Sequence, residues 1–390
     1  LDASVVLGSA TPSVDSYYRA KRGEYRLLTL TKRVKERPLP ACGVVDLRQE
    51  LREGNRSILS RRLDGLMEQR LRAGEQTMLF INRRGVAGFV SCRACGHVIK
   101  CPHCDVSLTE HFQGTAREKL VCHYCGYEIA KPKVCPKCAS PYIAGFGIGT
   151  QKVEQVKTLF PGARVLRMDA DTTKNKNSHE QILSRFANGE ADILVGTQMI
   201  VKGHDFSNVT LVGMIAADLT MFDNDFRSSE RTFDLLTQAA GRAGRGDLPG
   251  EVVIQTYVPD HYCIESAAKQ DYEAFYEEEK AYRSLMSYPP FGHMLAVFME
   301  SEQYNTVMQL SLTLKELAEN APKGQEVVVV GPCDATIARI NDRYRRVLYL
   351  KYKDKDRLIR IKDQMEQYLE QSGNDSDCYV TFDFDPLTSY

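Results

Sequence analysis

Eight of the chain's twelve cysteines lie in four Cys-x₂-Cys pairs between residues 92 and 138. A Cys-x₂-Cys turn places two thiolates on one side of a tight bend, and two such turns complete a tetrahedral Zn²⁺ shell. Four thiolates leave no open coordination position, so sites of this kind are structural rather than catalytic. The spacing therefore predicts two structural zinc sites, with the ligands Cys92, Cys95, Cys101, Cys104, Cys122, Cys125, Cys135 and Cys138.

Two assignments of the four pairs to two zinc ions are possible. The inner pairs, Cys101/Cys104 and Cys122/Cys125, match the Cys-x₂-Cys-x₁₅₋₂₀-Cys-x₂-Cys zinc pattern directly. The outer pairs would then form a second site on the same antiparallel finger. A sequential assignment would give the first four cysteines one zinc and the last four another, but it has to accommodate the short connection from Cys95 to Cys101. We favour the nested arrangement.

A second candidate site follows the strand predicted at Asp192–Val195. The strand leads into Gly196-Thr197, and Lys202-Gly203-His204-Asp205 comes shortly after. Hydroxyl and backbone N–H groups at the end of a strand can hold a phosphate group, and a glycine allows its close approach. An ordinary loop between a strand and a helix could have the same sequence, so both interpretations stay open at this point.

The sharpest candidate is the segment from Gln238 to Gly246, which contains Gly-Arg-x-Gly-Arg. Arg242 and Arg245 are three residues apart, which places them on the same side of a helical turn. A fixed guanidinium fork suits a triphosphate whose charge shifts during hydrolysis, which is the arginine-finger role. The alternative is a solvated basic turn, but a Gln one helical turn earlier is unusual there.

The elements that must position these groups alternate between strands and helices. Such alternation is typical of a parallel sheet with helices on both faces. An apolar strand is also expected at Val5–Thr11. The predicted strands are Met78–Asn82, Arg164–Met168, Asp192–Val195, Leu211–Ala217 and Glu251–Val258, and the predicted helices are Ser57–Arg72, Ser178–Gly189 and Ser228–Ala240.

The pattern changes after residue 260. One long charged helix is expected over His261–Met286, followed by a domain boundary at Pro289-Pro290. Beyond it the order becomes βαββαβ, which indicates a ferredoxin-like α+β domain. Its elements are expected at His293–Glu300, Tyr304–Glu319, Glu326–Val330, Val347–Tyr352, Arg357–Leu369 and Tyr379–Phe384.

Composition narrows the class of protein. Lys plus Arg and Asp plus Glu both number 51, so the net charge is zero and any nucleic-acid contact requires local basic surface. The apolar runs are too short to span a bilayer, no signal peptide opens the chain, and zinc-spaced thiols indicate a reducing compartment. We expect a cytoplasmic protein without membrane contact, and the first residue, Leu1, suggests a fragment of a longer one.

Three of these segments resemble motifs of superfamily 2 helicases. Gln238-x₂-Gly-Arg-x-Gly-Arg is similar to motif VI, the segment from Gly196 to Phe206 to motif V, and Gly8–Pro12 to motif III. A motor lobe with an eight-cysteine insertion after Asn82-Arg83-Arg84-Gly85 resembles the PriA family of bacterial replication-restart helicases. The resemblance covers essentially the whole chain, including the terminal Asp383-Phe384-Asp385-Pro386.

The resemblance implies an ATP-dependent 3′→5′ DNA helicase that binds stalled or branched forks and starts primosome assembly. The implied partners are DNA at forks and single-strand/duplex junctions, primosome proteins, single-strand-binding protein and the system that loads the replicative helicase. The implied cofactors are ATP with Mg²⁺ beside the two zinc ions, in a bacterial, nucleoid-associated cytoplasmic protein. The implied site residues are Arg242, Arg245, Gln238, Asp205 and Gly203 for ATP, and Thr197, Lys202, Arg83, Arg84, Arg343, Arg345 and Arg346 for DNA.

The same resemblance gives the domain organisation. It implies a RecA-like second helicase lobe with an inserted two-zinc Cys₄ finger, followed by the ferredoxin-like domain, which would bind DNA. The expected parts are the end of the first lobe at 1–20, the second lobe at 21–90 and 144–260, the zinc insertion at 91–143, a connecting helix at 261–290 and the C-terminal domain at 291–390.

Two motifs of a complete ATPase are missing from the sequence. It contains neither Gly-x₄-Gly-Lys-Ser/Thr, which cradles phosphates, nor an Asp-Glu-x-His box for Mg²⁺. Both belong to the first lobe, so we expect these 390 residues alone to hydrolyse no ATP. The alternative is a non-catalytic zinc scaffold that binds DNA and primosome proteins, for which the arginine pair would have no use.

Overall fold

The computed structural model of the chain divides into two compact units. The first comprises residues 1–86, 148–223 and 227–279, and the second comprises 87–147, 224–226 and 280–390. The structure describes residues 3–30, 38–55, 57–81, 89–92, 99, 102, 108–111, 118–121, 127–139, 141, 143–146, 155–169, 172–173, 178–197, 200, 206–215, 217, 226–256, 258–320, 327–372 and 378–387.

The first unit is built on a six-stranded sheet in which every pair of neighbours is parallel. The central strands are buried along their whole length, as is usual for a parallel sheet covered on both faces. The alternation predicted from the sequence is confirmed. The strand order is β1 (Ala41–Asp46), β11 (Glu251–Thr256), β10 (Val209–Ile215), β2 (Gln76–Ile81), β9 (Ile193–Gly196) and β8 (Val165–Met168).

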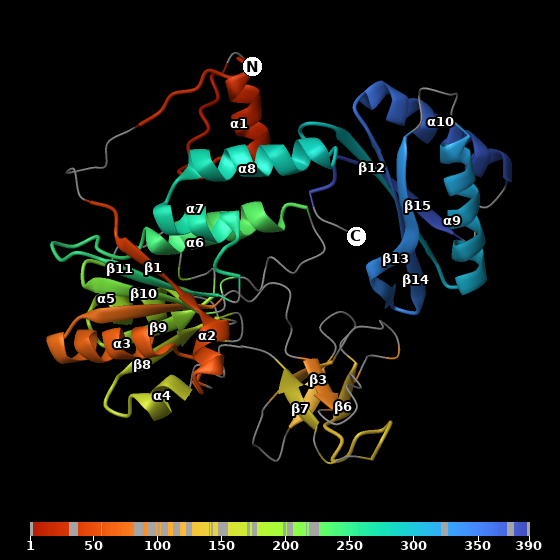
Figure 1. Ribbon diagram of the computed structural model, residues 1–390. Helices are drawn as coiled ribbons and strands as arrows, with labels where there is room; N and C mark the ends of the chain where they lie inside the picture. The colour runs from red at the N-terminus through yellow and green to blue at the C-terminus, as the bar shows by residue number, and fades with distance from the viewer. Residues whose placement is uncertain are drawn as a thin grey trace. The chain divides into compact units, whose positions relative to one another are not determined.

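Helices cover both faces of this sheet. Figure 1 shows α3 (Arg61–Ala73) on one side and α6 (Ser228–Ala240) on the other. Ser60 caps the start of α3, and Gly74 ends it in the left-handed conformation at φ 70°. The helix packs directly on the sheet, because a Cβ at Gly213 of β10 would lie 2.9 Å from Leu63. Shorter helices are α2 (Leu47–Arg52), α4 (Gln155–Leu159) and α5 (Ser178–Ala187).

The N-terminal segment differs from its prediction. Residues 5–10 form no strand, and Val5, Val6 and Leu7 are between 74% and 87% exposed. A strand needs a neighbour for its backbone hydrogen bonds, and this segment pairs with no strand among the residues that the structure describes. The first regular element is instead α1 (Val14–Lys21), which Ser13 caps.

The single helix predicted over His261–Met286 is in fact two helices. α7 (Tyr262–Lys269) ends at Gln270, which takes the left-handed conformation at φ 54°, and α8 (Tyr272–Leu285) begins two residues later. The side chain of Asp271 accepts a hydrogen bond from the backbone N–H of Ala274 and so helps to start the second helix. Polar and charged residues continue through Gln270 and Asp271, so the sequence pattern gives no sign that the helix ends there.

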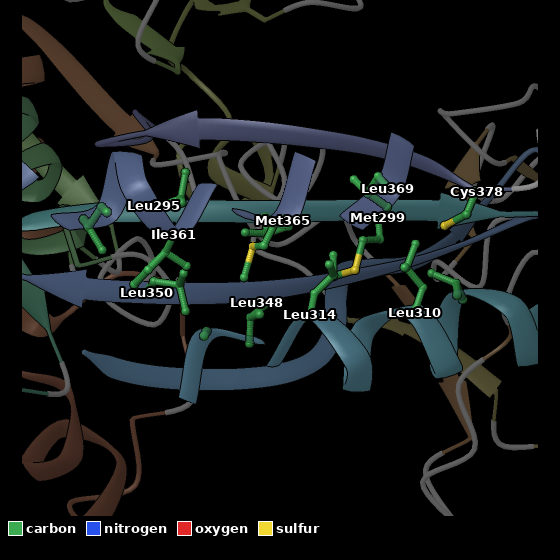
Figure 2. Close-up of a cluster of buried hydrophobic side chains, with 14 residues drawn as sticks. Leu295, Met299, Leu310, Leu314, Leu348, Leu350, Ile361, Met365, Leu369 and Cys378 are labelled. Atoms are coloured by element: carbon green, nitrogen blue, oxygen red, sulfur yellow. The ribbon is translucent and has the colours of Figure 1, made fainter. Parts of the chain in front are cut away.

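The C-terminal domain has the predicted βαββαβ order and a ferredoxin-like antiparallel sheet. The strand order is β13 (Val328–Ile340), β14 (Arg343–Tyr352), β12 (His293–Ser301) and β15 (Tyr379–Phe384). The helices α9 (Tyr304–Glu319) and α10 (Lys355–Ser372) pack on one face of the sheet. Figure 2 shows the resulting core, with Leu295 and Leu350 from the strands and Leu314 and Met365 from the helices.

The cysteine-rich segment forms a third, antiparallel sheet in the order β6-β5-β4-β3-β7. Its small core contains Ile99, Leu108 and Leu120, and Ile340 at the end of β13 packs against it. The strands are β3 (Phe89–Cys92), β4 (Thr109–His111), β5 (Lys119–Val121), β6 (Glu128–Ala130) and β7 (Ile143–Phe146). Across the described part of the chain, no helix has the length and apolar character that a bilayer crossing requires.

Candidate functional site

The arginine pair lies in a turn at the end of α6. The helix buries one face, including Phe233 and Leu236, and ends at Ala240 as the sequence predicts. Gln238 is exposed near that end, whereas Arg242 and Arg245 are half-buried in the turn that follows. The Nε of Arg245 donates a hydrogen bond of 2.8 Å to the carbonyl oxygen of Gly241. This bond fixes the direction of the Arg245 side chain relative to the helix end.

Glycines hold this turn close to two neighbouring segments. Gly244 has φ 69°, and its backbone N–H donates to the carbonyl oxygen of Val209, the first residue of β10, at 3.0 Å. A Cβ at Gly244 would lie 2.5 Å from the nitrogen of Gly250, and a Cβ at Gly246 would collide with the carbonyl oxygen of Ser207. The arginine pair is therefore fixed beside residues 207–209 at the amino ends of β10 and β11.

The second candidate lies at the other edge of the same sheet. Thr197 directly follows the last residue of β9 and is 8% exposed. All strands of this sheet are parallel, so the carboxyl end of β9 and the amino ends of β10 and β11 lie at opposite edges. The structure thus separates Thr197 from the arginine turn. Five other predicted residues of this unit lie outside the described residues, namely Arg83, Arg84, Lys202, Gly203 and Asp205.

A buried contact joins the N-terminal segment to α6. Glu230 of α6 is 8% exposed, and its Oε1 accepts a hydrogen bond of 2.9 Å from the backbone N–H of Val14. The Thr11 hydroxyl donates to Asp234, one helical turn further along α6. Burial raises the pKa of Asp234 to about 7, and the nearby Glu230 adds to this rise. These two acids were not singled out in the sequence, although they stand four residues apart on the apolar face of α6.

The cysteine pair nearest β7 has the local geometry of a metal-binding turn. Cys135 is 2% exposed, and its sulfur accepts a hydrogen bond from the backbone N–H of Lys137 at 3.4 Å. The N–H of Ala139 closes the turn onto the carbonyl oxygen of Cys135 at 2.8 Å. An N–H group directed at the sulfur stabilises a thiolate, so this pair fits a zinc ion.

Backbone pairing shows which of the strands next to the cysteine pairs in sequence are neighbours in this sheet. Cys92 is the last residue of β3 and pairs with Ile143 of β7. Thr109 of β4 pairs with Val121 of β5, and in the sequence these two strands stand between Cys104 and Cys122. Only the backbone of Cys92 is described. Five predicted ligands lie outside the described residues, namely Cys95, Cys101, Cys104, Cys122 and Cys125.

The three C-terminal arginines of the prediction stand in strand β14, which begins at Arg343 and not at Val347 as predicted. Arg343 forms an ion pair with Glu300 at 3.3 Å. Arg345 lies over the ring of Phe298 at 4.7 Å. Arg346 is 8% exposed, because it bonds to Asp334 at 3.2 Å and to the carbonyl oxygen of Pro332 at 3.0 Å.

Three family profiles match separate parts of the chain. Residues 144–247 match the helicase conserved C-terminal domain, which contains the arginine turn. Residues 101–129 match the PriA DNA helicase Cys-rich region, and residues 284–387 match the primosomal protein N C-terminal domain. These matches agree with the three sheets, and the match to the PriA Cys-rich region falls on the cysteine-rich sheet.

Curated relatives match almost the whole chain. The replication restart protein PriA of Bacillus subtilis is 47% identical over 98% of this chain and 47% of that protein. The proteins of the same name from Synechocystis and Chlamydia pneumoniae are 43% and 38% identical, over 98% and 100% of this chain and 46% and 51% of those proteins. The chain thus spans about half the length of these relatives. Over nearly its whole length the chain is therefore a homologue of the replication restart protein PriA, and it carries matches to the PriA Cys-rich region and the primosomal protein N C-terminal domain together with a helicase C-terminal domain.

Proposed function

We propose that the chain supplies the second motor lobe, the zinc module and the C-terminal domain of an ATP-dependent 3′→5′ DNA helicase of replication restart. The observation that carries the proposal is the arginine turn, which Gly244 and Val209 hold at one edge of the parallel sheet. A scaffold that only bound DNA would not need a glycine-packed turn that holds two arginines and fixes the direction of one, Arg245.

The nucleotide role belongs to a longer protein, which we call the parent protein, in which a first motor lobe precedes these residues. In it, Arg242 and Arg245 would contact the phosphates of ATP, while Gln238 and Asp205 would support the closed cleft and Gly203 would allow close approach. The phosphate cradle and the Mg²⁺ ligands would come from the first lobe. Fixed positive charge beside a phosphoryl group stabilises the charge that develops during transfer.

The zinc module would hold two ions in the nested arrangement. Cys92 ends β3 and Cys95 follows it in the sequence, while Cys135 and Cys138 precede the neighbouring strand β7, so the outer four thiolates would flank one strand pair. The inner four flank the β4–β5 pair in the same way. Each site would thus fix the ends of two paired strands, which stabilises a sheet too small to fold by hydrophobic burial alone.

DNA contact would be shared between the two units. Thr197, Lys202, Arg83 and Arg84 would contact the phosphate backbone in the motor lobe. In the C-terminal domain we assign contact with branched DNA to Arg343 and Arg345, because Arg346 already holds β13 and β14 together. Forks would be the DNA substrate, and primosome proteins, single-strand-binding protein and the helicase-loading system would be the protein partners, in the bacterial cytoplasm.

Strand displacement on forked DNA by the parent protein tests this proposal. We expect displacement that requires ATP and proceeds 3′→5′ along the strand that carries the motor. A protein that binds forks but displaces no strand with ATP would be a scaffold, and the proposal would be wrong.

A further inference from the structure

An aromatic pair joins the segment before α6 to the start of the C-terminal domain. The rings of Phe226 and Tyr288 stack with centroids 4.6 Å apart and planes 3° from parallel. Each ring also has a cation over it: Arg283 lies 5.2 Å from the centre of Phe226, and Lys351 lies 4.2 Å from the centre of Tyr288. Stacked rings and cation–π contacts each add to the burial of their apolar surface.

The partners of Phe226 are held firmly in the second unit. Arg283 is fully buried and donates to the carbonyl oxygen of Pro289 at 3.4 Å. Lys351 is 7% exposed and donates to the carbonyl oxygen of Met286 at 2.9 Å. Tyr288 stands in a tight turn, since its N–H bonds to the carbonyl oxygen of Arg283 at 2.9 Å. Burying two cations costs less here because the rings and carbonyl groups replace part of their hydration.

Phe226 is also two residues from the start of α6. The chain passes from the second unit to the first between Phe226 and Arg227, and the helix begins at Ser228. The 13 residues of α6 span about 20 Å. Because backbone hydrogen bonds connect its turns, the helix moves as one body. At its far end Ala240 leads directly into the turn that contains Arg242 and Arg245.

We propose that Phe226 is a positioning residue that couples the C-terminal domain to the arginine turn through α6. This inference rests on the proposed function, because it assigns a role in DNA-stimulated ATP hydrolysis. A C-terminal domain engaged with DNA fixes Tyr288 and Lys351, these fix Phe226, and the helix transmits that placement to Arg242 and Arg245. Phe226 touches neither nucleotide nor DNA in this scheme.

The test is the ATPase rate of the parent protein, measured with and without single-stranded DNA, in Phe226→Ala, Phe226→Leu and Phe226→Tyr. We expect the rate without DNA to stay at the wild-type value. The DNA-stimulated kcat should fall roughly two- to tenfold in the Ala and Leu variants, which is the range that loss of one aromatic pair produces. The Tyr variant keeps a ring and should keep the stimulation, and Tyr288→Ala added to Phe226→Ala should cause no further loss.

The matched control is Tyr304→Ala, which removes an aromatic residue that is 46% exposed in the same domain and packs on Tyr344 rather than near α6. It should leave both rates unchanged. An equal fall of the two rates in Phe226→Leu would mean that the stack only stabilises the fold, and full stimulation in the Ala and Leu variants would also overturn the inference. A wild-type protein without DNA-stimulated turnover would instead refute the proposed function itself.

Discussion

At the scale of single residues, helix α6 and the turn after it contain an arginine whose side chain is held by a hydrogen bond and acidic side chains that are buried. Arg245 is directed by its bond to Gly241, and the acids Glu230 and Asp234 lie on the same helix, facing the N-terminal segment. The Asp234 carboxylate accepts a hydrogen bond from the Thr11 hydroxyl. Among the described residues, none of the contacts that shift the pKa of Asp234 is with a positively charged group. The charge of Asp234 therefore lowers the stability of the folded chain at neutral and higher pH.

Replacing Asp234 by Asn should stabilise the chain in a pH-dependent way. The folded pKa of about 7 is raised from 3.8, so the folded state retains a proton that the unfolded state has lost, and stability falls as pH rises toward 7. At pH 8 the substitution should raise the free energy of unfolding by about 2 kcal/mol, since Asn keeps a hydrogen-bond acceptor for Thr11 without the charge.

Thermal unfolding of the 390-residue chain at pH 6 and pH 8 measures this effect. The gain should shrink at pH 6, where the folded Asp234 is largely protonated. Glu278→Gln is the matched control, because Glu278 is an exposed acid on α8 and its change should alter neither midpoint. An equal gain at both pH values would show that the titration of Asp234 is not the cause.

At the scale of elements, the sequence predicted helices and strands that have a regular apolar period, but it did not predict contacts between segments that are distant in the sequence. α6 and β15 begin and end where their apolar periods predict, because each buries a regular face. The strand expected at Val5–Thr11 has no partner among the described residues, and apolar composition alone does not form a strand. The stack of Phe226 on Tyr288 joins residues far apart in sequence, and no periodicity could indicate it.

The turn after α6 should tolerate a methyl group at one glycine and not at another. Gly244→Ala forces a Cβ to 2.5 Å from Gly250 at a positive φ, whereas a Cβ at Gly241 meets only ordinary contacts at 3.5 Å. We expect Gly244→Ala to lower the free energy of unfolding by about 1–3 kcal/mol and Gly241→Ala to change it by less than about 0.5 kcal/mol. Chemical denaturation of both variants measures the difference, and equal effects would contradict this account of the turn.

At the scale of the whole molecule, the order of parts was readable because each has its own pattern. Paired cysteines, strand–helix alternation and βαββαβ succeed one another along the chain, and three separate sheets correspond to them. The packing of Ile340 against the core of the cysteine-rich sheet was not predictable, since it joins two of these parts. The zinc assignment belongs to this scale, because each ion would connect cysteines from distant segments.

Double substitutions distinguish the two zinc assignments. In the nested arrangement Cys92 and Cys135 share one ion, so Cys92→Ser with Cys135→Ser should leave one zinc per chain. Cys92→Ser with Cys101→Ser disables both nested sites and should leave none. The sequential arrangement predicts the reverse for each pair, and metal analysis of the purified variants decides between them.

The measurement that tests the central claim most directly is DNA-stimulated ATP hydrolysis by the parent protein with Arg245→Ala. An arginine that stabilises the transferred phosphoryl group should cost about a thousandfold in kcat when removed. Arg185→Ala, which removes an exposed arginine paired with Glu190 in the same unit, should leave turnover unchanged. The account predicts robust ATP hydrolysis by the wild-type protein that is lost in Arg245→Ala and kept in Arg185→Ala. An Arg245→Ala variant that hydrolyses ATP at the wild-type rate would contradict the account.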